Sequence, residues 1–233
     1  MISFNTRLTI DRLGRRGEGV AQGPDGLVFV PYALAGETII AEIDGSRGTL
    51  IEVLTPSPDR IASFCRYYAR CGGCAVQTLA VQSYARWKRD LVADALQRAG
   101  LNAEVAALID AHGAGRRRAT FHARYPQGRA KTGFTQVHTH DIVEILSCPV
   151  LAASMDPALP AARALGQALA GSDKPLDILV TATASGLDVD LKGHGPLGEA
   201  ATQRLVKIAL AHDLARLSNH GETVLSNRTP MLT

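Results

Sequence analysis

The four cysteines constrain this chain more than any other feature of its sequence. Cys65, Cys71 and Cys74 lie close together, and Cys148 follows more than seventy residues later. Four thiolates satisfy one tetrahedral zinc ion, or they supply one ligand to each iron of a four-iron cluster. If all four bind one metal site, the fold has to bring distant stretches of chain together. Disulfides are the alternative, but a cytosolic chain and the short step from Cys71 to Cys74 both disfavour them.

The spacing of the cysteines favours iron and sulfur over zinc. Zinc ribbons usually supply their ligands as two close pairs, whereas here three close cysteines are followed by a lone one before Pro149. Gly72 and Gly73 would let backbone amides approach the sulfurs of a cluster. A radical enzyme that uses S-adenosylmethionine needs a different cysteine spacing and an open iron. We therefore predict a [4Fe-4S] cluster in which each iron has a cysteine ligand, and structural zinc remains the alternative. The four predicted ligands are Cys65, Cys71, Cys74 and Cys148.

The hydrophobic pattern predicts a mixed fold of two domains. Residues 1–57 contain short apolar stretches and tight turns, which predict an all-β, OB-like barrel with strands at 7–11, 26–30, 37–43 and 48–53. Residues 58–233 predict an α+β domain that carries the four-cysteine site. Its expected helices are 80–98, 158–170 and 197–211, and its expected strands are 120–124, 132–135, 142–144, 176–182 and 186–192. Residues 222–233 alternate like a strand, so the chain is expected to be truncated.

A basic block in the middle of the chain predicts a polyanion partner. Residues 61–131 hold twelve Lys and Arg against four acidic residues, whereas residues 151–233 hold seven against eight. A face of this kind binds phosphates by releasing their counterions. On charge alone, an ordinary solvated surface explains the block equally well. The sequence has no apolar run long enough for a membrane span and no apolar signal core, so a cytoplasmic protein without a membrane partner is expected.

Several stretches resemble parts of known proteins. The sequences RGEGVA at 16–21, FVP at 29–31 and AGE at 35–37 resemble the TRAM domain, an RNA-binding barrel of the OB type. The run CRYYARCGGC at 65–74, followed by Gln77 and Lys88, resembles the cluster motif of the RNA uracil-5-methyltransferases. The arginine triplet at 116–118 and the stretches around 133–134, 142–143 and 148–151 resemble the central domain of that family.

This resemblance implies the 23S ribosomal RNA type of the family, in which the barrel and the cluster occur together. It implies a ribosomal RNA partner and a further Rossmann-like domain that binds S-adenosylmethionine and carries the catalytic residues. No catalytic or S-adenosylmethionine-binding residue is therefore expected in this segment, and a monomer is expected. Carbon 5 of uracil attacks a methyl donor only after a thiolate has added at carbon 6. Because the cluster occupies all the thiols, the segment alone is expected to be inactive.

The candidate RNA contacts are the basic side of the helix at 80–98, the arginine triplet and one aromatic ring. They are Arg86, Lys88, Arg89, Arg116, Arg117, Arg118 and Phe134. The triplet fits a phosphate clamp or a solvated loop. Aromatic rings could stack on unpaired bases, although residues in barrels and sheets are more often part of the core; the candidates are Phe29, Tyr32, Phe121 and Phe134.

The sequence also contains two weaker motifs and is compatible with two rival functions. Residues 193–198 fit the dinucleotide fingerprint GxGxxG, but the strand before them alternates polar and apolar residues, so we interpret the match as coincidence. His138 and His140 could present metal ligands, yet no further partner is evident. The rival functions are a stand-alone RNA-binding module with structural zinc and a relative of the radical methylthiotransferases.

Overall fold

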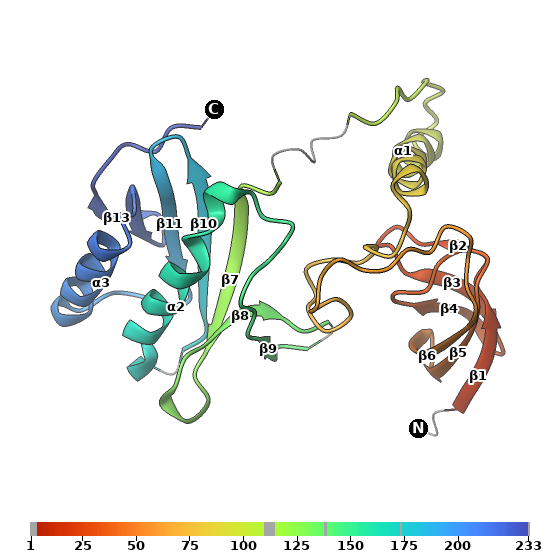
Figure 1. Ribbon diagram of the computed structural model, residues 1–233, viewed down its shortest axis with the longest axis horizontal. Coiled ribbons are helices and arrows are strands. Elements are labelled where there is room, and N and C mark those ends of the chain that lie inside the picture. Colours follow the sequence, from red (N-terminus) through yellow and green to blue (C-terminus); the bar gives the residue numbers. More distant parts are fainter. Residues whose placement is uncertain (1–3, 110–114, 138, 173, 233) are drawn as a thin grey trace. The chain divides into compact units, whose positions relative to one another are not determined.

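The computed structural model describes residues 4–109, 115–137, 139–172 and 174–232. Over these residues the fold is mixed, with two β-sheets and three α-helices (Figure 1). The chain divides into two compact units. The first contains Met1–Ala69 and Cys74–Asp110, and the second contains Arg70–Gly73 and Ala111–Thr233. The domain limits expected from the sequence, 1–57 and 58–233, stay a prediction.

The first unit is built on a six-stranded sheet that curves into a half-barrel (Figure 1). Its strand order is β1-β5-β6-β4-β3-β2, and the pairs are antiparallel except for a parallel contact between β4 and β6. The strands are β1 Phe4–Thr9, β2 Arg12–Leu13, β3 Gly19–Gly23, β4 Gly26–Val30, β5 Thr38–Asp44 and β6 Arg47–Thr55. The predicted OB-like barrel is thus supported as a half-barrel, and its likeness to a TRAM domain stays a prediction.

Alternation of side chains explains how this sheet buries its core. In β4, Val28 and Val30 are buried whereas Leu27 and Phe29 are exposed, as expected for a strand with one face inward. The inward residues form one apolar cluster of Leu8, Ile10, Ala21, Val28, Val30, Ala33, Ile39 and Ala41. The strand expected at 7–11 is shifted, because β1 pairs with β5 from Phe4 to Thr9 and the chain turns after it.

The helix α1, Val81–Arg98, follows the half-barrel and confirms the helix expected at 80–98. All of its residues are described, and none of them is buried. The indole N–H of Trp87 donates to the carbonyl of Gly14 at 3.3 Å, which attaches the helix to the loop after β2. The apolar side chains of this helix are therefore only partly covered by the described residues of the first unit.

The second unit is a seven-stranded sheet with helices α2, Ala158–Ala168, and α3, Glu199–Ala211, on one face (Figure 1). The strand order is β13-β12-β11-β10-β7-β8-β9, and only the β11 and β12 pair is parallel. The strands are β7 Arg118–Arg124, β8 Lys131–Thr135, β9 Ile142–Val143, β10 Leu176–Thr183, β11 Gly186–Lys192, β12 Arg216–Asn219 and β13 Glu222–Ser226. Short 3-10 turns occur at Pro126–Gly128, Ala153–Met155 and Ala170–Ser172.

The central strands of this sheet have one apolar and one polar face. In β10, Leu176, Ile178 and Val180 are fully buried, while Asp177 and Thr181, on the opposite face, are half-buried. The buried residues pack under the two helices and form the core of the second unit. The strands and helices expected here are confirmed within a few residues of their ends, except that the final strand ends at Ser226. Among the described helices, none is both long and apolar enough to cross a membrane.

Candidate functional site

The four cysteines are divided between the two units. Cys65 and Cys74 belong to the first unit, and Cys71 and Cys148 belong to the second. Each of the four side chains is half-buried. Across the described residues, no three His, Cys, Asp or Glu side chains gather closely enough to hold a metal ion. The four-cysteine metal site therefore stays a prediction.

Backbone amides around two of the thiols have the arrangement that a metal-binding thiolate needs. The N–H of Tyr67 donates to Cys65 Sγ at 3.4 Å, and the N–H of Gly73 donates to Cys71 Sγ at 3.4 Å. Each donor lies two residues after its cysteine, and hydrogen bonds of this kind stabilise a ligating sulfur. The soft sulfur donors and these local amide bonds together fit an iron-sulfur cluster or zinc.

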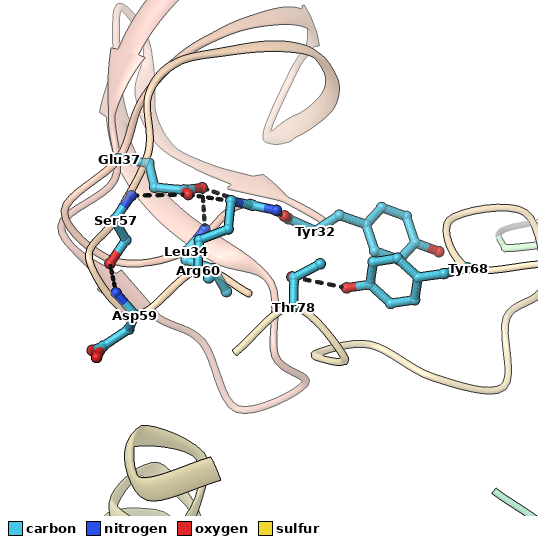
Figure 2. A network of polar contacts seen from close by, with 8 residues as sticks. All are labelled: Tyr32, Leu34, Glu37, Ser57, Asp59, Arg60, Tyr68 and Thr78. Carbon is cyan, nitrogen blue, oxygen red and sulfur yellow. Dashed lines mark hydrogen bonds and ion pairs between the residues drawn. The ribbon is translucent and has the colours of Figure 1, made fainter. Parts of the chain in front are cut away.

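A buried carboxylate anchors the chain that leads into the cysteines. The side chain of Glu37, which directly precedes β5, is completely buried. It accepts hydrogen bonds from Arg60 Nε at 2.5 Å and Nη2 at 2.8 Å, and from the amides of Leu34 at 2.8 Å and Ser57 at 3.2 Å (Figure 2). Burial acts to raise the pKa of Glu37, but these four donors outweigh it and hold the pKa below its ordinary value. Glu37 is therefore a carboxylate at neutral pH.

The same network reaches the cysteine loop through two tyrosines. Arg60 Nη2 also donates to the carbonyl of Tyr32 at 2.8 Å, and the Tyr32 ring meets the Tyr68 ring edge-on with centroids 5.1 Å apart (Figure 2). The Tyr68 hydroxyl donates to the carbonyl of Ala75 at 2.8 Å and lies 3.4 Å from the hydroxyl of Thr78. Burial raises the pKa of Tyr68. Because Tyr68 and Ala75 lie beside the loop's cysteines in sequence, the network fixes the chain on both sides of the loop.

In the second unit, Arg116 lies against both cysteine-bearing stretches. Its N–H donates to the carbonyl of Val150 at 2.9 Å, and its carbonyl accepts the N–H of Ala152 at 3.0 Å. Its guanidinium Nη1 donates to the carbonyl of Gly73 at 3.3 Å. These bonds join the chain after Cys148 to the chain after Cys71.

The basic residues predicted on α1 make local contacts of their own. Arg86 is exposed and donates to Ser83 Oγ at 3.0 Å, and Arg89 Nε donates to the carbonyl of Val105 at 2.8 Å. The amine of Lys88 lies 5.5 Å from the centre of the Trp87 ring, close enough for a cation-π contact. These contacts orient the three cations without neutralising their charge.

Arg118, at the first position of β7, and Arg117 are exposed in the second unit. Phe134, on β8 of the same sheet, is half-buried and stacks on Phe121 with centroids 5.2 Å apart. The stacking role suggested for Phe121 is wrong, because its side chain is fully buried. Phe29, on the half-barrel, is 38% exposed and so keeps an accessible ring.

The fingerprint at 193–198 has a structural explanation. The amides of Gly193 and Gly195, which would face a phosphate in a nucleotide site, instead lie 3.3 and 3.4 Å from His220 Nε2 and donate to it. Asn219 Nδ2 donates to the carbonyl of Gly195 at 3.0 Å. A histidine from the turn after β12 thus occupies the donors, in agreement with the coincidence interpretation. Of the two candidate histidine ligands, His140 is exposed and His138 lies outside the described residues.

Sequence reasoning missed the Glu37 and Arg60 pair and the structural contacts of Arg116. Twenty-three residues separate Glu37 from Arg60, and no periodicity links them. The only signal was the short AGE motif at 35–37, which places an acid directly before an apolar strand. Arg116 was grouped with its neighbours by charge, although its backbone pairing sets it apart.

Comparison with curated proteins finds relatives that match almost the whole chain. A protein of Brucella suis named an uncharacterized RNA methyltransferase is 37% identical over 226 residues, which are 97% of this chain and 54% of that protein. A protein of Caulobacter vibrioides with the same description is 39% identical over 234 residues, covering 97% of this chain and 56% of that protein. A Methylococcus capsulatus protein named 23S rRNA (uracil(1939)-C(5))-methyltransferase is 36% identical over 152 residues, 61% of this chain and 34% of that protein.

The chain spans about half the length of the first two of these relatives. No protein-family model matches it. The chain is thus homologous over nearly its whole length to proteins that are named RNA methyltransferases.

Proposed function

We propose that this chain is the RNA-binding and iron-sulfur portion of an S-adenosylmethionine-dependent 23S ribosomal RNA uracil-5-methyltransferase, a cytoplasmic and monomeric protein. The observation that carries the proposal is the match over 97% of the chain to proteins named RNA methyltransferases. The relative named for uracil C5 of 23S rRNA supports the choice of substrate. In this proposal the half-barrel and the basic residues hold RNA, and methyl transfer depends on residues outside this stretch.

The assignment of methyl transfer to other residues follows from the chemistry of uracil. A thiolate has to add at carbon 6 before carbon 5 can attack a methyl donor. We assign all four thiols of this chain, Cys65, Cys71, Cys74 and Cys148, to a [4Fe-4S] cluster. No thiol then remains to act as the nucleophile, so the chain alone is expected to bind RNA without methylating it.

When bound, the cluster would supply a covalent link between stretches of chain that are far apart in sequence, and thereby favour the folded state. The chain's own residues prepare the ligands. The amides of Tyr67 and Gly73 point at two sulfurs, and Tyr68 holds the loop through the carbonyl of Ala75. These contacts support Cys65 and Cys71 as ligands.

RNA binding is assigned to cations on both units, all of them exposed except the half-buried Lys88. Arg86, Lys88 and Arg89 lie on α1, and Arg117 and Arg118 lie at the start of β7. The half-exposed ring of Phe29 offers a stacking surface on the half-barrel. Phosphate contacts provide affinity that depends on salt, and stacking provides contacts to unpaired bases.

Two measurements test the proposal. The first is iron, acid-labile sulfide and zinc analysis of the chain purified without oxygen, with a visible spectrum. About four irons and four sulfides per chain are expected for a closed cluster. One zinc without sulfide would overturn the iron-sulfur assignment.

The second measurement is fluorescence anisotropy with a labelled 23S rRNA fragment, repeated over a salt series. We expect tighter binding than to a transfer RNA of similar length, and an affinity that falls steeply with salt. Equal affinity for the two RNAs would overturn the ribosomal assignment, and affinity independent of salt would overturn the phosphate contacts.

A further inference from the structure

We infer that Gly115 and Arg116 form a brace that positions Cys71 and Cys148. Arg116 then supports the cysteine site, whereas Arg118, two residues later, is the arginine assigned to RNA contact. The inference rests on the proposed function, because it takes the cysteines to be metal ligands. The brace gives Arg116 a different role from Arg117 and Arg118, the other two arginines of the triplet. All the contacts involved lie within the second unit.

The backbone of Arg116 fixes the chain that follows Cys148. Arg116 pairs with Leu151 as an isolated parallel bridge, with hydrogen bonds to Val150 and Ala152 on either side. The N–H of Leu151 donates to the carbonyl of Cys148 at 3.1 Å, which closes a turn that starts at the cysteine. The place of Arg116 therefore sets the place of that turn.

The side chain of Arg116 fixes the chain that follows Cys71. Its Nη1 donates to the carbonyl of Gly73 at 3.3 Å, and the N–H of Gly73 in turn donates to the sulfur of Cys71 at 3.4 Å. The peptide that Arg116 holds is thus the one that supports the Cys71 sulfur. On its other side the loop is docked on the sheet, since Gly72 N–H donates to the carbonyl of Thr135 at 2.9 Å.

The chain at position 115 approaches Leu151 and Ala152 so closely that only a residue without a Cβ fits there. Gly115 has a φ of +69°, a conformation that favours glycine. A Cβ there would lie 2.8 Å from the nitrogen of Ala152 and 2.9 Å from the carbonyl carbon of Leu151. Because both obstacles are backbone atoms, neither can move aside as a flexible side chain would. A substitution at Gly115 has to push the bridge apart.

Arg118 makes none of these contacts among the described residues and serves as the matched control. It is exposed at the first position of β7 and pairs along the sheet with Thr181 of β10. Arg116 and Arg118 carry the same charge and lie two residues apart. A difference between their substitutions therefore reports position and contacts rather than charge.

The experiment compares anaerobically purified wild type with Gly115→Ala, Arg116→Ala and Arg118→Ala. The rate of iron loss to a chelator is followed by visible absorbance, and far-ultraviolet circular dichroism checks that each variant is folded. Loss of a group that supports metal ligands typically weakens the site by about 10- to 100-fold. Because Arg116 is exposed, we expect iron loss to be about tenfold faster in Arg116→Ala. Gly115→Ala is expected to lose iron at least as fast, and Arg118→Ala to match wild type.

RNA binding of the same proteins supplies the second readout. Arg118→Ala should lower the salt slope of RNA affinity by about 0.7 to 1, the value for one phosphate contact, whereas Arg116→Ala should leave the slope unchanged. Wild-type iron retention in both Gly115→Ala and Arg116→Ala would overturn the brace, as would a lowered salt slope in Arg116→Ala.

The two proposals fail in distinguishable ways. A wild type without bound metal would overturn the proposed cluster and the brace together. A wild type that holds zinc would overturn only the cluster, and release of zinc to a colorimetric chelator would then test the brace on the same thiols. If Arg116→Ala is unfolded, Arg116→Lys gives the decisive comparison, because it keeps the charge and loses the planar fork.

Discussion

Substitution of Arg60 by alanine should destabilise the first unit strongly. The change removes two hydrogen bonds to the Glu37 carboxylate, at 2.5 and 2.8 Å, and one to the carbonyl of Tyr32 at 2.8 Å. Glu37 would remain buried as a carboxylate with only the amides of Leu34 and Ser57 as donors. A buried charge that loses its partner is far more costly than an exposed one.

The expected magnitude follows from the burial of the two side chains. Breaking a buried ion pair by removing one partner costs about 3–5 kcal/mol. The Glu37 side chain is 0% exposed, but that of Arg60 is 21% exposed, so water can replace part of the lost interaction. We therefore expect the lower end of that range, about 3 kcal/mol. With a urea dependence of about 2 kcal/mol per molar, the unfolding midpoint should fall by about 1.5 M.

Urea unfolding followed by tryptophan fluorescence is the appropriate assay. The chain has one tryptophan, and Trp87 lies in the first unit with its indole N–H on the carbonyl of Gly14, so its emission reports this unit. The double variant with Glu37→Gln should recover part of the loss, because no uncompensated charge stays buried.

The matched control is Arg216→Ala in the second unit. Arg216 pairs with Asp188 at 2.7 Å, but the two side chains are 39% and 22% exposed. Its loss should cost less than about 1 kcal/mol and leave the Trp87 transition in place. A midpoint shift below about 0.5 M in Arg60→Ala, or no recovery in the double variant, would refute the reasoning about Glu37.

Three further predictions concern single groups. The pKa of Glu37 is lowered from 4.5, so its contribution to stability is complete above about pH 4.5 and is lost as pH falls through the lower pKa of the folded state. Thermal melts between pH 6 and 3, followed by Trp87 fluorescence, should show this loss in wild type and little of it in Glu37→Gln. Cys148→Ala should lose the visible absorbance of the proposed cluster faster under chelator than wild type, and unchanged retention would count against closed ligation. Burial raises the pKa of Tyr125 to about 12, and its hydroxyl finds no partner among the described residues. Tyr125→Phe should therefore be neutral or stabilising by up to about 1 kcal/mol in urea unfolding. It should also remove one tyrosine that ionises at about pH 12 from an alkaline absorbance titration.

The sequence was most informative where side chains alternate over a long element. Strand β11, Gly186–Lys192, was predicted with its observed limits because leucine and valine alternate with polar residues along it. Strands β2, β3 and β12 were not predicted. β2 and β12 have two and four residues, and elements this short have no measurable period of their own. Their pairing is decided by neighbours that are distant in sequence. β3 has five residues with glycine at both ends, and glycine is uncommon in strands.

The candidate site was predictable in its chemistry but not in its supports. Cysteine spacing identified the thiols as possible ligands, because the chemistry belongs to the residue type itself. The roles of Glu37 and Arg116 depend on which backbone groups they meet, and these lie on strands and loops far along the chain. Charge counting placed Arg116 with Arg118, whereas the structure distinguishes them by the backbone bridge of Arg116 to Leu151 and by its side-chain bond to Gly73.

The short outer strands of the two sheets bear on how the chain behaves at high concentration. The first sheet ends in β2 and the second in β9, each of two residues. An outer strand with few free amides and carbonyls is a poor template for pairing with another chain. Aggregation by strand addition should therefore begin at the opposite edges, β1 and β13, where five or six residues run uninterrupted. A lysine or proline placed on those two strands is the change to try if the purified chain precipitates.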